Sequence, residues 1–249
     1  MRRGAGALLP AALLGLWHLA VQRAWLPPQI LPPPGLVWQS LHELWSSGEL
    51  GEHLRISLGR VGWSLLIGGG AGLLLGVAMG LLDSFRAYVQ PSFEMVAQFP
   101  VVGWVPLLIL FVGIDEPLKV VAISIAVAVP VAVNSDRGIR QIPRAWLEVA
   151  RVYRFSLPQV LGRVVLPAAT PSLFNGLRQG VMQAWLSLVF VELLASSEGI
   201  GFLMVWGRQL MQLDLVIVAM VAIGMVGVLL DTGLRCIEAR LQTWRRTAY

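Results

Sequence analysis

The chain has 249 residues, of which 56% are apolar and only 13% are charged, and its mean hydropathy is +0.71. Soluble domains are about 45–50% apolar and about 25% charged, so this chain lacks the charge needed to cover a soluble surface of its size. The composition therefore excludes an ordinary soluble domain and indicates a membrane protein whose length suits one compact domain.

The charge and the cysteine count exclude further classes. The net charge is +5, but the arginines fall in short loops between apolar runs, so we interpret them as orientation signals and do not expect nucleic-acid binding. Cys236 is the single cysteine, which excludes an internal disulfide and a cysteine-based metal site. The three histidines do not cluster, and we predict no metal site.

Six segments are apolar and long enough to be membrane helices, which need about 20 residues with a range of about 17–25. They predict an all-α membrane protein of about six transmembrane helices. The third and fourth are short and contain prolines, which lipid tolerates where neighbouring helices satisfy the freed carbonyls, so we expect both to be buried in the bundle. The six segments are 7–26, 57–82, 98–114, 118–134, 172–195 and 214–235.

The first segment, 7–26, follows two arginines and could also be a cleaved signal peptide, although we favour an uncleaved helix. The region 27–54 after it begins with a proline cluster, which predicts an extended external linker. An amphipathic stretch follows, and we expect an interfacial helix there with Leu36, Leu41, Leu44 and Trp45 on one face.

The second span contains a glycine at every fourth position, in "IGGGAGLLLGVAMG". Residues four apart line one stripe of a helix, and in lipid small residues let two helix backbones approach closely. The stripe predicts a tightly packed seam, either against a moving helix or as ordinary static packing. Its members are Gly68, Gly72, Gly76 and Gly80.

Between the fourth and fifth spans the chain turns polar. Apolar residues at a helical spacing of three or four, interleaved with charged residues, predict a short amphipathic helix; they are Ile142, Trp146, Val149 and Val152. "RFS" interrupts the pattern, and Ser156 is a plausible N-cap for a second helix with Pro158 in its first turn. Leu166 and Pro167 are expected to end that helix. The apolar side of the second helix consists of Val160, Leu161, Val164 and Val165.

The segment 144–166 thus forms two short helices at an angle, exposed between two membrane spans. An ordinary basic loop would not explain the periodic apolar residues. A protruding helix pair of this kind suits docking into a groove on a soluble partner.

The outer end of the fifth span carries Glu192, a carboxylate near membrane depth and hence a candidate functional residue. We favour a structural or gating role for it over direct ligand contact. The following stretch, 196–213, is too polar to span, yet it has apolar residues at helical spacing. It predicts a re-entrant or interfacial helix, either as a gate at the external mouth or packed on the bundle surface. The candidate gate residues are Gly199, Gly201, Phe202 and Trp206.

The basic residues are distributed unequally between the two sides of the predicted bundle. Thirteen of the nineteen fall on one side, and the positive-inside rule places that side, with both termini and the tail 238–249, in the cytoplasm. These thirteen are Arg2, Arg3, Arg86, Arg137, Arg140, Arg144, Arg151, Arg154, Arg163, Arg235, Arg240, Arg245 and Arg246.

Motifs of catalysis are missing from the sequence. It contains no H-E-x-x-H, no G-x-S-x-G and no G-x-x-x-x-G-K-[ST] phosphate loop, so we expect no enzyme activity and no bound cofactor. A self-contained channel or secondary transporter remains the alternative to a multi-subunit machine. Such transporters often show repeats and midplane charges, whereas we find no convincing repeat and no charge pair at depth.

The polar segment resembles the motif E-A-A-x3-G-x9-I-x-L-P of the permease subunits of ABC importers. Glu148, Ala150, Leu166 and Pro167 match it, with the spacing from glutamate to Leu-Pro intact. The likeness extends over about 55–240. "RISLGRVGWSLLIG", "FPVVGWVPLLILFVGI" and "SSEGIGFLM" are similar to the nitrate/sulfonate/taurine branch of these permeases.

Three positions depart from the motif. Val149 and Val164 are mild replacements of an alanine and the isoleucine. Arg154 replaces the glycine that would ease the turn between the two helices, so the arginine either tolerates that turn or contacts the partner.

The resemblance implies an importer permease of the bacterial inner membrane. Its transmembrane domain covers 53–237, after an N-terminal region 1–52. A second permease copy, two cytoplasmic ATPase subunits that bind the ATP, and an external solute-binding protein are the implied partners. The implied solute is a small anion such as an aliphatic sulfonate, taurine or nitrate. The implied ATPase contacts are Glu148, Ala150, Arg154, Val164, Leu166 and Pro167.

Overall fold

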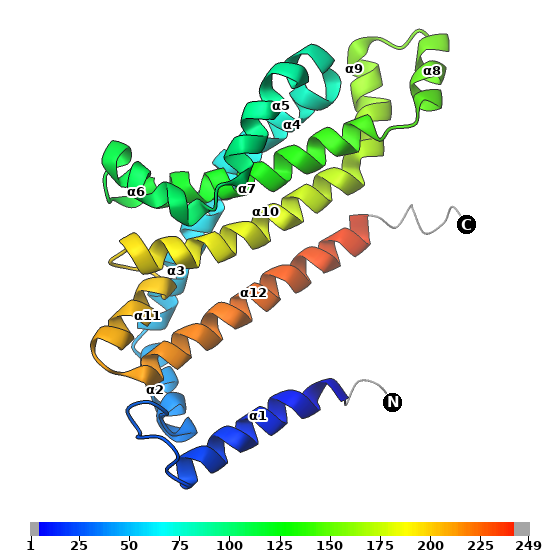
Figure 1. Cartoon of the computed structure of the whole chain (residues 1–249). Helices are drawn as coiled ribbons and strands as arrows, with labels where there is room; N and C mark the ends of the chain where they lie inside the picture. The colour runs from blue at the N-terminus through cyan, green and yellow to red at the C-terminus, as the bar shows by residue number, and fades with distance from the viewer. Residues whose placement is uncertain (1–4, 242–249) are drawn as a thin grey trace. The chain divides into compact units, whose positions relative to one another are not determined.

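The computed structural model describes residues 5–241 as a succession of helices (Figure 1). They are α1 (Ala5–Gln22), α2 (Pro34–Ser46), α3 (Glu49–Ser64), η1 (Leu65–Gly69), α4 (Gly70–Leu81), α5 (Asp83–Gln98), α6 (Val101–Val112), α7 (Glu116–Arg140), α8 (Arg144–Val152), α9 (Leu157–Val160), η2 (Leu161–Val165), α10 (Leu166–Ala195), α11 (Ile200–Gln209) and α12 (Leu213–Leu241). The chain divides into two compact units. Of the described residues, the first holds 5–57 and 196–225, and the second holds 58–195 and 226–241.

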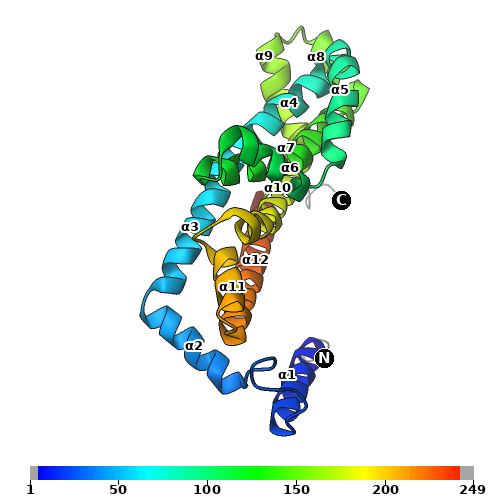
Figure 2. The same cartoon turned by 60° about the vertical axis from the view of Figure 1, so that its left-hand side comes forward.

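The second unit is built around α7. This helix lies against α4 and η1 on one side and against α10 on another, and α6 contacts it as well (Figures 1 and 2). Residues of α7 such as Leu118, Ile123 and Val127 are completely buried. A helix that is apolar and buried around most of its circumference belongs in the middle of a bundle, as the sequence predicts for the span 118–134.

The glycine stripe of α4 and η1 forms the predicted packing seam, and its partner is α7. A side chain on Gly72 would place its Cβ 2.5 Å from the carbonyl oxygen of Ala128, a distance that side-chain carbons do not reach. Gly68 and Gly76 meet the backbone of α7 at Ser124 and Ala132 in the same way. The two backbones are therefore in direct contact, and only glycine fits.

Small residues also bring α10 onto α7. Gly176 of α10 faces Asn134 and Pro130, and Gly138 of α7 faces Ser172. These contacts set the two helices antiparallel, with the C-terminal end of α7 beside the N-terminal part of α10. Close approach through small residues compensates for the missing hydrophobic drive between helices in lipid.

The predicted spans correspond to helices, but not all of them are long enough alone. Glu49–Leu81, Glu116–Arg140 and Leu213–Arg240 meet the length and hydropathy of a membrane span. These are three spans within the described residues. The number of spans rises to five if each of two bent helix pairs crosses the membrane as one span, and five is still fewer than the six expected. The apolar part of α1 covers Leu8–Gln22 and is shorter than a full span.

The expected span 98–114 differs most from its prediction. Its helix, α6, has 12 residues, about 18 Å at 1.5 Å per residue, whereas the hydrocarbon core is about 30 Å thick. The preceding helix α5 meets α6 at 99°, and only the two helices together are long and apolar enough to cross a membrane. The bend falls at Phe99 and Pro100, because Pro100 begins a new helix and cannot continue the previous one.

The first unit is connected by a few polar contacts. The indole Nε1 of Trp17 donates to the Pro32 carbonyl at 3.1 Å, and the Ser40 hydroxyl donates to the Asp214 carboxylate at 2.5 Å. In α2 the predicted single apolar face is wrong. Leu44 is buried beside Ser40, whereas Trp45 is 69% exposed. Leu44 and Trp45 are consecutive and therefore point about 100° apart around the helix.

The seam between α4 and α7 generates a stability prediction. Gly72→Val should lower the free energy of unfolding by about 1–3 kcal/mol, because the new side chain must displace the α7 backbone. Gly70→Val is the matched control, since a Cβ on Gly70 meets nothing within 4 Å. Denaturation of the two purified variants in detergent measures the difference, and equal stability would contradict the seam.

Candidate functional site

The segment predicted to protrude forms the helix pair α8 and α9–η2, which we call the helix pair 144–165. It is anchored to the ends of α7 and α10 by a small core of Ile139, Ile142, Val165 and Ala169. Leu147 and Val160 pack against this core from the two helices of the pair. Leu161 packs against the same core, so the predicted apolar side is confirmed for Val160, Leu161 and Val165 but not for Val164.

The outer face of α8 is apolar and exposed. Trp146 is 52% exposed, Val149 55% and Val152 79%, whereas Ala150 of the same helix is buried. The side chain of Glu148 is exposed and contacts no partner within residues 5–241. The periodic apolar residues therefore do not serve the core of this chain, apart from Ile142.

The turn after α8 explains the glycine of the motif. The N–H of Phe155 donates to the Ala150 carbonyl and the N–H of Arg154 donates to the Arg151 carbonyl, both at 2.9 Å. This pair of bonds is the Schellman arrangement, whose penultimate position adopts a left-handed conformation and usually carries glycine. Arg154 occupies that position with φ = +52°. The arginine thus accepts a backbone conformation that favours glycine.

The second helix starts as predicted but does not end at Leu166 and Pro167. Gln159 Oε1 accepts from the Ser156 backbone N–H at 2.9 Å, which is half of a capping box and places Ser156 at the N-cap. The helix then passes through the π-helical turn η2 directly into α10. There the N–H of Leu166 donates to the Leu161 carbonyl, and the wider turn accommodates the missing donor of Pro167. Val164 is half-buried, and Leu166 and Pro167 are exposed.

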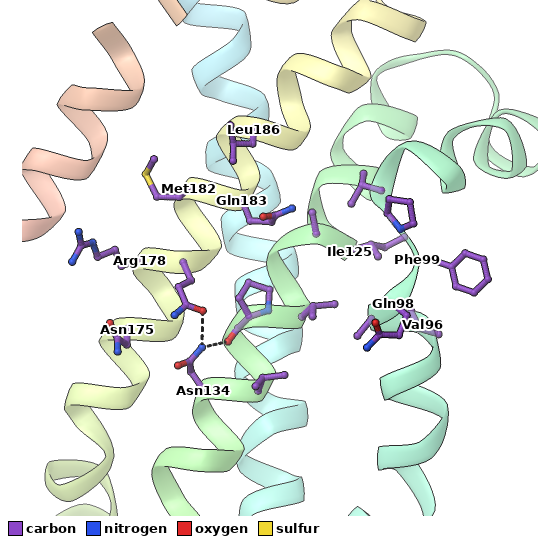
Figure 3. A pocket seen from close by; sticks show the side chains of 18 of the residues that line it. Val96, Gln98, Phe99, Ile125, Asn134, Asn175, Arg178, Met182, Gln183 and Leu186 are labelled. Atoms are coloured by element: carbon purple, nitrogen blue, oxygen red, sulfur yellow. Dashed lines mark hydrogen bonds between the residues drawn. The ribbon is translucent and has the colours of Figure 1, made fainter. Parts of the chain in front are cut away.

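A cavity of about 890 Å³, lined by both polar and apolar side chains, lies in the second unit between α7, α10 and the junction of α5 with α6 (Figure 3). The Asn134 amide of α7 donates to the Pro130 carbonyl at 2.8 Å and to Gln179 Oε1 of α10 at 3.1 Å. Gln98 at the end of α5 and Gln183 of α10 line the same space. The sequence analysis did not single out these amides, because isolated Asn and Gln in apolar helices form no recognised motif.

One guanidinium at the cavity is neutralised. Arg178 donates to the Asp231 carboxylate at 2.7 Å and to the Glu238 carboxylate at 3.3 Å. Figure 3 shows its side chain directed away from α7. Asp231 is also paired with Arg235, so the ionic group is balanced in charge.

Glu192 lies in a buried ionic cluster that the sequence analysis missed. Its side chain is fully buried, and its Oε1 accepts from Arg60 Nη1 at 2.7 Å. Arg60 is itself 3% exposed and also donates twice to Glu116, at 2.6 and 2.8 Å. Lys119 completes the cluster with a bond of 2.7 Å to Glu116.

The sequence analysis expected no charge pair at depth in the predicted spans, and the buried pair of Arg60 and Glu192 shows that this expectation is wrong. The geometry of this cluster supports a structural role for Glu192. Arg60 and Glu192 are far apart in sequence, and the predicted span around Glu192 also contains Arg178, so neither residue indicates its partner.

Glu192 lies in the second unit. The other candidate gate residues all lie in the first unit. Gly199, with φ = +104°, donates its N–H to His53 Nδ1 at 3.0 Å, and Gly201 is buried at the start of α11. The rings of Phe202 and Trp206 lie 6.0 Å apart, and Phe202 also lies 6.3 Å from the His53 ring. The predicted helix within 196–213 is present as α11. Its role as a gate stays a prediction.

The bundle around α7 and the helix pair 144–165 define a membrane permease component of an ABC importer. The family of binding-protein-dependent transport system inner membrane components matches residues 68–243, and the chain belongs to it.

The named relatives agree with this assignment. The chain is 36% identical to "Putative aliphatic sulfonates transport permease protein SsuC" of Bacillus subtilis (97% of this chain, 88% of SsuC). It is 31% identical to the taurine transport system permease protein TauC of Escherichia coli (94% and 87%). It is 33% identical to the bicarbonate transport system permease protein CmpB of Synechococcus elongatus (84% and 69%).

A solved structure supports the fold. A chain of the MetNI methionine ABC transporter in an inward-facing conformation aligns with a TM-score of 0.59 at 18% identity, over 77% of this chain and 93% of that one. At this identity the likeness concerns the fold alone.

The buried cluster generates a second stability prediction. Glu192→Ala should cost about 3 kcal/mol, because breaking a buried ion pair leaves Arg60 partly uncompensated. Glu52→Ala is the matched control, since it removes the carboxylate from an exposed arginine pair and should barely change stability. Denaturation of both variants in detergent provides the measurement. Equal, small losses would show that the cluster contributes little.

The turn at Arg154 generates a third prediction. Arg154→Gly should stabilise the protein by up to about 1 kcal/mol, because an L residue costs about 1–2 kcal/mol in the left-handed region, partly offset by the entropy of glycine in the unfolded chain. Arg151→Gly, in the helical part of α8, should instead destabilise by about 0.5–1 kcal/mol. Opposite signs in melting experiments support the turn geometry, and a loss in both variants would contradict it.

Proposed function

We propose that this chain forms the translocation pathway for a small amphiphilic anion of the aliphatic sulfonate class, driven by an ATPase docked on the helix pair 144–165. Two copies of the chain would form the pathway, two ATPase subunits would bind and hydrolyse the ATP, and an external binding protein would deliver the solute. The chain itself has no phosphate loop, so its part is non-catalytic.

The exposed outer face of α8 is the observation that carries this proposal. Trp146, Val149 and Val152 form an apolar face that stays half or more exposed within residues 5–241, and Glu148, beside them, has no partner among the same residues. Interfaces with soluble partners typically combine an apolar centre with a few polar contacts that fix orientation. The anchoring core at Ile139 and Ile142 lets this face transmit movement to the membrane helices.

The same helix pair supports a cytoplasmic orientation for both termini. An ATPase requires cytoplasmic ATP, so its docking surface lies in the cytoplasm. The arginines of that surface, such as Arg144, Arg151 and Arg163, agree with the positive-inside rule.

The substrate class rests on the relatives and on the cavity. SsuC and TauC carry sulfonate and taurine in their names. The cavity offers neutral amides and a guanidinium beside apolar side chains, a lining suited to a solute with an anionic head. A sulfonate oxygen accepts hydrogen bonds from amides and guanidinium groups.

A self-contained channel or secondary transporter is the competing function, and the buried Arg60–Glu192 pair is the observation in its favour, because buried charge pairs are common in secondary transporters. Copurification separates the two. The importer requires a stoichiometric soluble ATPase and ATP-dependent uptake, and a channel requires neither.

Docking at Glu148 generates the fourth prediction. Glu148→Ala should weaken ATPase binding about ten- to a thousandfold, because a desolvated charge pair at an interface typically contributes about 2–5 kcal/mol. The exposure of Glu148 in this chain favours the lower end of that range. Copurification and uptake in membrane vesicles measure the effect, with membrane insertion checked separately.

Glu94→Ala is the control for this experiment, because Glu94 is an exposed carboxylate on α5 that accepts a hydrogen bond from Gln90 of the same helix. It should leave docking unchanged. If Glu148→Ala inserts, binds its ATPase and transports at wild-type rates, the assigned docking surface is wrong.

A further inference from the structure

We infer that the cavity between α7, α10 and the α5–α6 junction is a solute site with two ends, which binds an anionic head at Arg137 and an alkyl tail at Ile125. The inference rests on the proposed function and narrows it to one substrate class, unbranched alkanesulfonates. No motif pointed to this site, because the cavity residues come from five helices.

The antiparallel packing of α7 and α10 sets the polarity of the cavity. Gly176 of α10 faces Asn134 of α7, and Gly180 faces Val127 and Val131. Positions late in α7 therefore lie beside positions early in α10, and the reverse holds at the other end. Apart from Val133, the cavity residues late in α7 and early in α10 are polar, namely Asn134, Arg137, Asn175, Arg178 and Gln179.

The opposite end of the cavity is mainly apolar. Ile125 and Val129 line it from α7, and Met182 and Leu186 line it from α10. Gln183 is the polar exception there (Figure 3). The lining thus changes from hydrogen-bonding to hydrocarbon along the helix pair, which suits a solute whose two ends differ in the same way.

Arg137 supplies the positive charge of the polar end. Within residues 5–241 its side chain forms no ion pair and no hydrogen bond. Arg178, by contrast, is already held by Asp231 and Glu238. The anionic head therefore pairs with Arg137, because binding it at Arg178 would require breaking existing ion pairs.

Amides at the same end complete the head site. Asn134 uses its amide N–H groups on Pro130 and Gln179, and Gln179 accepts through Oε1. The Nε2 group of Gln179 therefore remains available as a donor, as does the amide of Asn175. Donors that are not ionised bind an anion without holding it too tightly for release.

The two ends together discriminate between classes of anion. Nitrate and bicarbonate have no tail to bury at Ile125, and the ammonium group of taurine would be placed against hydrocarbon without a carboxylate partner. An alkanesulfonate satisfies both ends. Each added methylene that enters the apolar end should strengthen binding by up to about fourfold.

Binding of a homologous series to the purified full-length permease in lipid nanodiscs tests the inference, with the binding protein left out. The probes are methanesulfonate to hexanesulfonate, with nitrate as an anion without a tail, taurine as a zwitterionic sulfonate whose tail ends in an ammonium group, and hexylammonium as a tail of opposite charge. The Kd should fall steadily with chain length, and nitrate, taurine and hexylammonium should bind at least about tenfold more weakly than hexanesulfonate.

Two variants assign the ends. Arg137→Gln should weaken every sulfonate by about ten- to a hundredfold, since a hydrogen bond to a charged group contributes about 1.5–3 kcal/mol. Ile125→Ala should flatten the chain-length dependence and leave methanesulfonate binding unchanged. Arg140→Gln is the matched control, because it removes an arginine one turn further along α7 that pairs with Asp83 outside the cavity.

The outcomes separate this inference from the proposed function. If the wild type binds no sulfonate, or if Arg137→Gln and Arg140→Gln behave alike, the assigned site is wrong even when ATPase copurification and ATP-dependent uptake succeed. Sulfonate binding with the expected pattern supports the site. If the ATPase does not copurify, the importer proposal fails independently of that pattern.

Discussion

Direct backbone contact between α7 and its two neighbours is the constraint on which the second unit depends. Lipid gives apolar helices no hydrophobic reason to associate, so dispersion between closely approaching backbones must hold them together. Glycines supply that approach, from Gly68 and Gly72 on one side to Gly176 on the other. The other features are positioned from α7. The ionic cluster at Glu116 lies at its N-terminal end, the cavity wall at its middle, and the anchor of the helix pair 144–165 at its C-terminal end.

Much of this arrangement could be predicted from sequence, because its signals are local. Length and hydropathy predicted most of the helices, the spacing of four predicted the glycine seam, and the apolar period predicted the helix pair. The boundaries were less predictable where a proline was involved. Pro167 predicted an end, yet the π-helical turn at 161–165 carries the helix through it. Pro100 predicted only an irregularity, yet it redirects the chain by 99°.

The site residues that sequence reasoning missed have no local signal. Arg60 and Glu192 become partners only because α3 and α10 meet α7 at the same level. Asn134 and Gln179 are isolated amides in apolar helices, and a hydropathy average treats them as minor interruptions. Conversely, Arg154 could be predicted as an anomaly from the motif alone, but only its φ of +52° shows that the position demands a left-handed backbone.

The arrangement also determines how force from the helix pair reaches the cavity. The anchor residues Ile139 and Val165 belong to α7 and to the turn that leads into α10, the two helices that line most of the cavity. Well-packed interiors transmit displacement because they compress little. A displacement of the helix pair therefore acts on both cavity walls at once, at the polar end beside Arg137. Close contacts hold α7 against both α4 and α10, so the two main cavity walls belong to one packed unit. Losing the hydrogen bond between Asn134 and Gln179 would by itself cost about 1 kcal/mol, whereas separating α10 from α7 would also break the packing at Gly176 and Gly138. The polar end of the cavity therefore lies nearest to the anchor of the helix pair, and a displacement of that anchor reaches it through the joined walls.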